Sequence, residues 1–273
     1  MSGPLAISVN GVVLNTAATA ISAMDRGLNY GDGLFETALI RDGAVRLLDA
    51  HLARLHLGCE RLKLAAPDPA KLLAEIAHLV GDTKDAVLKI VITRGTTGRG
   101  YRPDPQGACT RILSLHPVPE RMSPQGLRLR WCEMRLSRNE RLAGIKHLNR
   151  LEQVLAQGEW EPAQFDEGLM LDTAGEIVSA TSANLFVVRQ GVLTTPDLRF
   201  CGVHGVMRAQ TLAAAERLGM PVSVEPLWPD DLTQASEVFL TNAVRGIRAV
   251  AALGELQWST APVADKLRET LRL

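Results

Sequence analysis

The chain has 273 residues, of which 46% are hydrophobic and 22% charged. This composition is typical of a soluble globular protein, and the length allows one large or two modest domains. Thirty basic residues balance thirty acidic ones, so the net charge argues against nucleic acid or an anionic membrane as a partner. An anionic ligand would need a local cluster of cations.

Cysteines and histidines give no sign of a metal site. The histidines include no HExxH arrangement, and the start of the chain lacks the basic end and long apolar stretch of a targeting segment. No apolar run approaches the roughly eighteen residues of a membrane span. We therefore expect a cytoplasmic protein without a metal, whose thiols stay reduced in the core. The widely spaced cysteines are Cys59, Cys109, Cys132 and Cys201.

Hydrophobic periodicity predicts a mixed α/β (α+β) chain. Segment 117–126 is rich in proline and lacks periodicity, so we interpret it as a linker between a smaller domain, 1–116, and a larger one, 127–273. Asp49 is the expected N-cap of a helix. The predicted elements are a hairpin at 5–14 turning at Asn10-Gly11, strands at 34–40, 86–95, 109–115, 127–136, 167–172, 176–188, 192–195 and 237–244, and helices at 49–62, 69–81, 148–155, 202–219 and 261–271.

Lys146 lies between the strand at 127–136 and the helix that follows. The spacing of Leu148, Leu151, Val154 and Leu155 predicts one buried stripe on that helix. A lysine on such a connection is well placed for covalent chemistry, which needs an unprotonated amine and so benefits from partial burial. A solvated surface lysine is the alternative interpretation.

Several segments together resemble a known family. They are NYGDGLFETALIRDG (29–43), HLARL (51–55), TRGTTGRGY (93–101), GIKHLNRLEQVLA (144–156) and SANLF (182–186). In this order they resemble the 4-amino-4-deoxychorismate lyases, which belong to the fold type IV pyridoxal-phosphate enzymes with the branched-chain and D-amino-acid aminotransferases. The resemblance implies a smaller N-terminal α/β domain and a larger C-terminal domain with a mostly β core flanked by helices. It also implies a homodimer.

The resemblance implies roles for individual residues. Lys146 would be the Schiff-base lysine and general base, and Thr37 would relay a proton or orient the leaving group. Arg54 would bind the cofactor phosphate, for which a planar guanidinium is well suited. The remaining phosphate contacts would come from the main chain of Val206 and Met207 at a helix start and from the turn at Asn242 and Ala243.

The substrate of such a lyase carries two carboxylates, so a local group of cations and hydroxyls is expected. By resemblance to the D-amino-acid aminotransferases, Arg99 and Tyr101 would hold a carboxylate, and Tyr30 is a weaker candidate for the same pocket. A glycine- and proline-rich loop such as 93–107 is otherwise most simply an exposed connection.

The sequence departs from the family at Ser179. Fold type IV enzymes usually have a glutamate five residues before the Asn of NLF, where its carboxylate pairs with the pyridine nitrogen, and that position here is Ser179. Glu176 lies three residues earlier, so in a regular strand it faces the other side and could replace the glutamate only through a bulge or register shift. A serine gives a weaker electron sink, which disfavours transamination and suits a lyase whose product gains an aromatic ring.

Three hypotheses follow. The first is a pyridoxal 5'-phosphate-dependent lyase that converts 4-amino-4-deoxychorismate, an anionic dicarboxylate, to 4-aminobenzoate and pyruvate for folate biosynthesis. The second is a D-amino-acid or branched-chain aminotransferase on the same scaffold, against which Ser179 argues. The third is a non-catalytic pyridoxal-phosphate-binding protein, which Lys146, Arg54 and Thr37 disfavour.

Overall fold

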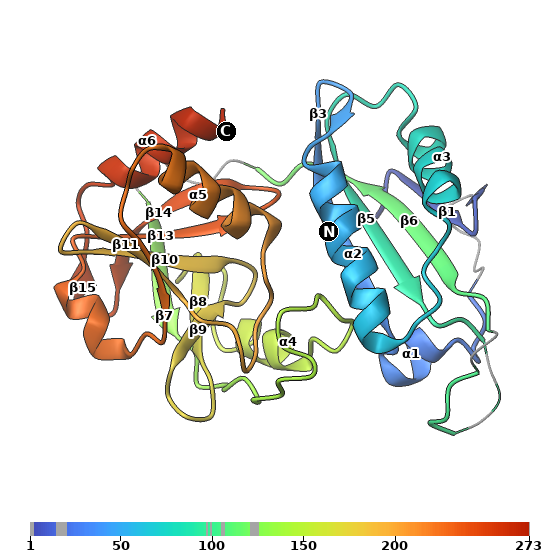
Figure 1. Cartoon of the computed structure of the whole chain (residues 1–273), viewed down its shortest axis with the longest axis horizontal. Helices are drawn as coiled ribbons and strands as arrows, with labels where there is room; N and C mark the ends of the chain where they lie inside the picture. The colour runs from blue at the N-terminus through green and yellow to red at the C-terminus, as the bar shows by residue number, and fades with distance from the viewer. Residues whose placement is uncertain are drawn as a thin grey trace. The chain divides into compact units, whose positions relative to one another are not determined.

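A computed structural model describes residues 3–14, 21–96, 98, 100–104, 107–120 and 126–272. The chain forms two compact units (Figure 1). The first comprises Met1–Glu120 together with Ile145–Asn149, and the second comprises Arg121–Gly144 together with Arg150–Leu273. The short segment that carries Lys146 therefore groups with the first unit, although its sequence neighbours on both sides belong to the second.

The first unit is built on a six-stranded antiparallel sheet with the strand order β2-β1-β6-β5-β3-β4. Asn10 and Gly11, both with positive φ, close the β1–β2 hairpin as the sequence predicts. The elements are β1 (Ala6–Val9), β2 (Val12–Leu14), α1 (Arg26–Tyr30), β3 (Gly33–Arg41), β4 (Ala44–Val45), α2 (Leu48–Leu62), α3 (Pro69–Val80), β5 (Ala86–Thr93) and β6 (Thr110–His116).

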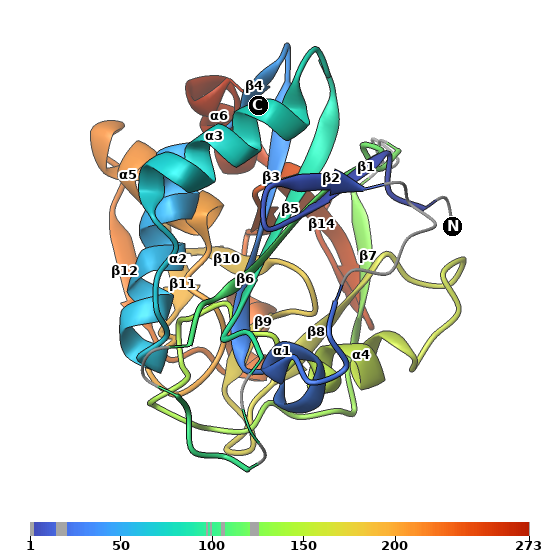
Figure 2. The ribbon, with the colours of Figure 1, turned by 90° about the vertical axis from the view of Figure 1, so that its right-hand side faces the viewer.

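The two faces of this sheet differ in burial. On one face lie Leu34, Leu88 and Leu113, each at most 2% exposed, and there the sheet packs against α2 and α3 (Figures 1 and 2). The opposite face carries the alternate residues of the same strands, among them Phe35 and Thr37 on β3, which are only half-buried. The side chains that do not contribute to the helix-covered core are thus presented on this second face.

The second unit contains a nine-stranded mixed sheet with the order β12-β11-β10-β13-β14-β7-β8-β9 and β15 paired to β14. Phe186 and Phe239 stack in one core cluster beneath α5 and α6. The elements are β7 (Leu127–Trp131), α4 (Leu151–Gln157), β8 (Glu167–Leu171), β9 (Ile177–Ala180), β10 (Asn184–Arg189), β11 (Val192–Pro196), α5 (Val206–Arg217), β12 (Val222–Glu225), the 3-10 helix η1 (Pro229–Gln234), β13 (Glu237–Asn242), β14 (Gly246–Leu253), β15 (Leu256–Gln257) and α6 (Pro262–Leu271).

Several details of the sequence prediction are wrong: the strand expected at 127–136 ends at Trp131, and the one expected at 176–188 is divided into β9 and β10. Asp49 is not an N-cap, because α2 starts one residue before it and its N-cap is Leu47, which has a positive φ of 55°. The helix expected from Leu148 begins only at Leu151, and the apolar stripe predicted on it is not buried within the chain. Of the stripe residues, Leu151, Val154 and Leu155 are 75%, 63% and 60% exposed, whereas the buried residue of the helix is Ala156.

The cysteines agree with the expectation of reduced core thiols. All four are free, and Cys59, Cys132 and Cys201 are buried. Burial raises the pKa of the Cys59 thiol to about 11 and that of Cys132 to about 12, so neither is a reactive thiolate near neutral pH. No helix in the described part of the chain is long and apolar enough to cross a membrane.

Candidate active site

Lys146 is fixed to the first unit through its main chain. Its carbonyl accepts a hydrogen bond of 3.0 Å from the Phe35 N–H, and the neighbouring His147 forms an isolated bridge with Leu34. The Lys146 side chain lies over the Phe35 ring, with Nζ 4.1 Å from the ring centroid. This contact, within cation–π range, directs the amine to the half-buried face of the sheet.

Thr37 lies on the same face as Phe35, because residues two apart on a strand point to the same side. It is opposite Lys89 in the β3–β5 pairing and is half-buried. Of the two residues that the resemblance assigns to catalysis, Thr37 therefore lies on β3 and Lys146 contacts the same strand at Phe35, two residues away. Sequence distance alone could not show this, since they are more than a hundred positions apart.

Arg54 forms a buried ion pair with Glu36. Its Nε donates to Glu36 Oε1 at 2.7 Å and its Nη2 to Oε2 at 2.5 Å, while His51 Nδ1 lies 2.6 Å from Oε2. Burial alone would raise the pKa of Glu36, but the hydrogen bonds from Arg54 and His51 outweigh it and hold the pKa below its usual value. The bidentate contact occupies the Nε–Nη2 edge of Arg54 and fixes its orientation.

Glu36→Gln should lower the free energy of unfolding by about 3–5 kcal/mol, because it leaves Arg54 and His51 without their buried charge partner. Since the folded-state pKa of Glu36 is lowered, the stabilisation is present above the unfolded-state value near 4.3 and is lost as pH falls through the lower, folded value. Urea denaturation at pH 7 and at progressively lower pH measures both effects. A variant as stable as the wild type at pH 7 would contradict the assignment.

Tyr30 and Tyr101 are brought together, with ring centroids 5.5 Å apart. Arg26 holds this pair: its guanidinium lies 4.8 Å from the Tyr30 ring centroid and donates to the carbonyl of Tyr101 at 3.0 Å. Tyr101 is 85% exposed. Arg99, the third residue expected to bind substrate, lies outside the described residues.

In the second unit, α5 starts at Val206, so Val206 and Met207 lie at a helix start as the sequence predicts. Gly205 caps α5 without any side-chain hydrogen bond, so the N–H groups of the first turn, including those of Val206 and Met207, have no side-chain acceptor. Asn184 at the start of β10 donates from Nδ2 to the Val203 carbonyl at 2.9 Å and packs against Gly205. The sequence analysis did not single out Asn184, although its side chain positions this helix start.

The turn after β13 lies next to the same strand end. Asn184 pairs with Thr241 in the β10–β13 ladder, and Asn242 donates to the Ser182 carbonyl at 3.4 Å. Asn242 Oδ1 also accepts from the N–H groups of Val244 and Arg245, so this side chain shapes the turn that contains Ala243. The Thr241 hydroxyl is buried and has no hydrogen-bond partner among the residues that the structure describes. A buried hydroxyl of this kind is suited to an absent ligand.

Ser179 lies on β9, where the pairing with β8 is irregular. Met170 pairs with Ser179 but Leu171 pairs with Ile177, so Val178 is the extra residue of a bulge. The side chains therefore do not alternate strictly between the two faces here, as the sequence analysis assumed. Strand alternation alone does not exclude Glu176 from the face of Ser179. Its carboxylate instead accepts from Arg138 Nη2 at 3.1 Å. The Ser179 hydroxyl makes no hydrogen bond with any described residue.

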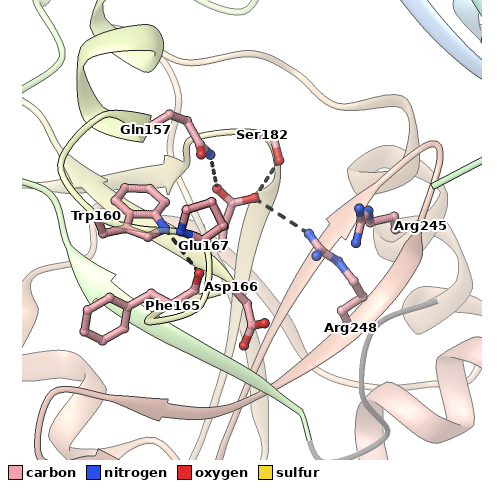
Figure 3. Close-up of a pocket in the computed structure, with 9 residues that line it drawn as sticks. Gln157, Trp160, Phe165, Asp166, Glu167, Ser182, Arg245 and Arg248 are labelled. Carbon is pink, nitrogen blue, oxygen red and sulfur yellow. Dashed lines mark hydrogen bonds and ion pairs between the residues drawn. The ribbon is translucent and has the colours of Figure 1, made fainter. Parts of the chain in front are cut away.

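A pocket of about 320 Å³ in the second unit contains none of the predicted cofactor residues (Figure 3). It is centred on Glu167, whose carboxylate accepts from Gln157 at 3.1 Å and from Ser182 at 2.5 Å and also lies 3.8 Å from Arg248. These contacts give Glu167 a structural role, since they tie the β9–β10 turn to α4 and β14. Within the described ranges, no group of three or more His, Cys, Asp or Glu residues is arranged to hold a metal.

The sequence profile of the class IV amino-transferases matches residues 33–253. The chain belongs to this family. An aminodeoxychorismate lyase of Vibrio harveyi is 33% identical over 238 residues, covering 86% of this chain and 88% of that protein. A 4-amino-4-deoxychorismate lyase structure from Pseudomonas aeruginosa is 45% identical with a TM-score of 0.92, covering 97% and 98% of the two chains.

The class IV family also includes aminotransferases. A putative branched-chain-amino-acid aminotransferase of Methanocaldococcus jannaschii is 31% identical over 245 residues, covering 88% of this chain and 85% of that protein. The fold expected from the sequence, that of the fold type IV enzymes, is confirmed by these similarities.

Class IV enzymes use pyridoxal 5'-phosphate, which needs an anion site for its phosphate and an amine for its aldehyde. The residues present fit these needs. The uncapped start of α5 and the unpartnered Thr241 hydroxyl are suited to a phosphate, and Lys146 offers the amine.

Proposed function

We propose that this class IV protein is a lyase that converts 4-amino-4-deoxychorismate to 4-aminobenzoate and pyruvate. The observation that carries the proposal is the placement of the Lys146 amine over Phe35, on the β3 face that also presents Thr37. An amine and a hydroxyl on one face are the groups that a proton-removing elimination requires. The 45% identity to the Pseudomonas aeruginosa lyase across nearly the whole chain supports the same activity.

Bound pyridoxal phosphate supplies an aldehyde that takes the substrate amine and a ring that withdraws electrons from the adjacent carbon. Lys146 would then serve as the base that removes the proton from the carbon that bears the nitrogen. The ether bond on the neighbouring ring carbon then breaks. The Thr37 hydroxyl can donate a hydrogen bond to the departing enolpyruvyl oxygen. Enolpyruvate ends as pyruvate, and loss of the proton and the ether makes the ring aromatic.

We assign to the predicted site residues the roles that the family resemblance implies. Lys146 is assigned to the aldehyde carbon, and Arg54, held by Glu36, to the phosphate. The main chain of Val206, Met207 and Ala243 and the turn shaped by Asn242 are also assigned to the phosphate, and Ser179 to the pyridine nitrogen. Tyr30, Tyr101 and Arg99 are assigned to substrate carboxylates. Glu36 and Asn184 position these groups without touching the substrate.

The activity test starts from purified protein loaded with pyridoxal phosphate. A visible absorbance band followed by stoichiometric pyruvate and 4-aminobenzoate on adding 4-amino-4-deoxychorismate is the expected result. Bleaching of that band by D-alanine or a branched-chain amino acid, without either product, would favour the aminotransferase alternative that the Methanocaldococcus jannaschii relative represents. A protein that binds the cofactor but shows neither reaction would contradict both.

We further propose that the protein is a homodimer in the cytoplasm, and that α4 contributes to the subunit contact. Leu151, Val154 and Leu155 are large, more than half exposed and on one short helix, and burying each would contribute about 1.5–3 kcal/mol. Leu155→Glu should shift the protein towards monomer in size-exclusion chromatography with light scattering, whereas Arg217→Glu, on an exposed position of α5, should not. A wild-type monomer at micromolar concentration would contradict the proposal.

A further inference from the structure

Arg26 is a buried arginine at the start of α1, next to the segment that carries Tyr101. It is 4% exposed, and its Nε donates to Asp32 Oδ2 at 2.8 Å. Its Nη1 and Nη2 donate to the successive carbonyls of Gly100 and Tyr101, at 2.8 and 3.0 Å. The same guanidinium lies 4.8 Å from the centroid of the Tyr30 ring, within cation–π range. One side chain therefore joins α1 to a segment that lies far away along the sequence.

Segment 100–103 has few other contacts that could fix its conformation. It forms no helix or strand, and within the described ranges Arg26 is the only side chain that hydrogen-bonds to its main chain. The Tyr101 side chain is largely exposed, so burial does not hold it. Its ring does contact Tyr30, but Arg26 also packs on that ring. The way in which Tyr101 is presented therefore depends on Arg26.

Arg94 binds the same carboxylate as Arg26 and has a different role. Its Nε and Nη2 donate to Asp32 at 2.8 and 3.0 Å, and its remaining hydrogen bonds go to two carbonyls at the end of α2. Burial alone would raise the pKa of Asp32, but the hydrogen bonds from Arg94 and Arg26 outweigh it and hold the pKa below its usual value. The ionised Asp32 thus anchors two arginines, of which Arg94 binds α2 and Arg26 binds segment 100–103.

We propose that Arg26 is a positioning residue for substrate binding, because it fixes the main chain of the segment that presents Tyr101. This inference rests on the proposed lyase activity, in which Tyr101 is assigned to a substrate carboxylate. A planar guanidinium donates in several fixed directions at once, whereas a lysine has one nitrogen and cannot reach a carboxylate and two carbonyls in these positions. Arg26 itself is buried and is not assigned to touch the substrate. Its replacement should therefore weaken substrate binding and leave the chemical step in place.

Chymotrypsin tests the contact without any turnover. This protease cleaves after tyrosine, and at Tyr101 it must bind the same carbonyl that accepts the hydrogen bond from Arg26. The chain can be cleaved there only while the contact is open, so the cleavage rate follows the opened population. In Arg26→Lys, cleavage after Tyr101, identified by mass spectrometry, should be about 10- to 100-fold faster, whereas cleavage within the second unit should not change.

The kinetic test uses the protein loaded with pyridoxal phosphate. In Arg26→Lys the KM for 4-amino-4-deoxychorismate should rise about tenfold or more, with a much smaller change in kcat. The absorbance and the Kd of pyridoxal phosphate should match the wild type, which verifies the fold. In Arg26→Ala, millimolar guanidinium chloride should lower the KM and the cleavage rate again, whereas ammonium chloride should not. General stabilisation cannot produce this rescue, since guanidinium destabilises folded proteins.

Arg94→Lys is the matched control, because it changes the other arginine on Asp32 and leaves the contacts of Arg26 in place. It should lower the unfolding midpoint without accelerating cleavage after Tyr101 or raising the KM. Unchanged cleavage in Arg26→Lys, or equal acceleration in both variants, would overturn the positioning role. Faster cleavage with an unchanged KM would overturn its link to substrate binding alone. A wild type without turnover would overturn the lyase proposal and that link together, whatever the proteolysis shows.

Discussion

Lys146→Ala should lose the visible absorbance of covalently bound pyridoxal phosphate and lower the rate of pyruvate release at least about 1,000-fold, at the upper end of what a general base contributes. The reason is that, in the proposed mechanism, the same amine holds the cofactor and removes the proton. The main-chain contacts of Lys146 to Phe35 do not involve the side chain, so the variant should fold normally. Absorbance spectra and a coupled pyruvate assay measure the two losses.

Lys84→Ala provides the control for this substitution, because Lys84 is exposed in the turn before β5 and should keep both spectrum and rate. Circular dichroism and the unfolding midpoint of Lys146→Ala should match the wild type. Turnover retained in a correctly folded Lys146→Ala protein would show that another group serves as the base.

Ser179→Glu should increase the rate at which amino acids convert the bound cofactor to its pyridoxamine form, by about tenfold or more, equal to about 1.4 kcal/mol of barrier. A carboxylate at this position would keep the pyridine nitrogen protonated and strengthen the electron sink that transamination needs. Stopped-flow absorbance with D-alanine and branched-chain amino acids measures the half-reaction.

Glu176→Gln separates the two candidate carboxylate positions. Because of the bulge at Val178, strand alternation no longer excludes Glu176. The hydrogen bond that Glu176 accepts from Arg138 nevertheless indicates a structural role for its carboxylate. If Glu176 served the pyridine nitrogen, Glu176→Gln would alter the spectrum of the bound cofactor and Ser179→Glu would add nothing. We expect the reverse pattern.

The regular elements could be predicted because their patterns are local. Alternating apolar residues mark β3 and β5, and Asn10-Gly11 marks the first hairpin. The start of α2 was harder to predict. Its N-cap is Leu47, which has a positive φ and no capping side chain, whereas sequence rules favour Asp49 as the cap. In α4 the apolar stripe could be predicted from its periodicity, but periodicity does not indicate which surface covers such a stripe.

Some candidate site residues could be predicted from the sequence and others could not. Lys146, Arg54 and the start of α5 lie in segments whose sequence resembles a family, so the resemblance could indicate them. Glu36 could not be found this way, because its role depends on two residues of α2 that the strand sequence does not show. A glutamate inside GLFETALIR indicates nothing by itself until Arg54 and His51 are placed beside it.

The segment Ile145–Asn149 also limits how the gene could be divided. The Phe35 N–H depends on the Lys146 carbonyl, and Asn149 donates to the Gly31 carbonyl, so a fragment that stops before residue 145 would leave these groups on β3 and its approach without their acceptor and donor. The preceding residue, Gly144, belongs to the second unit, where its N–H donates to the Gly202 carbonyl. Neither unit is therefore encoded by one continuous stretch of sequence, and recombination at the 117–126 segment would transfer the first sheet without Lys146 and the residues around it.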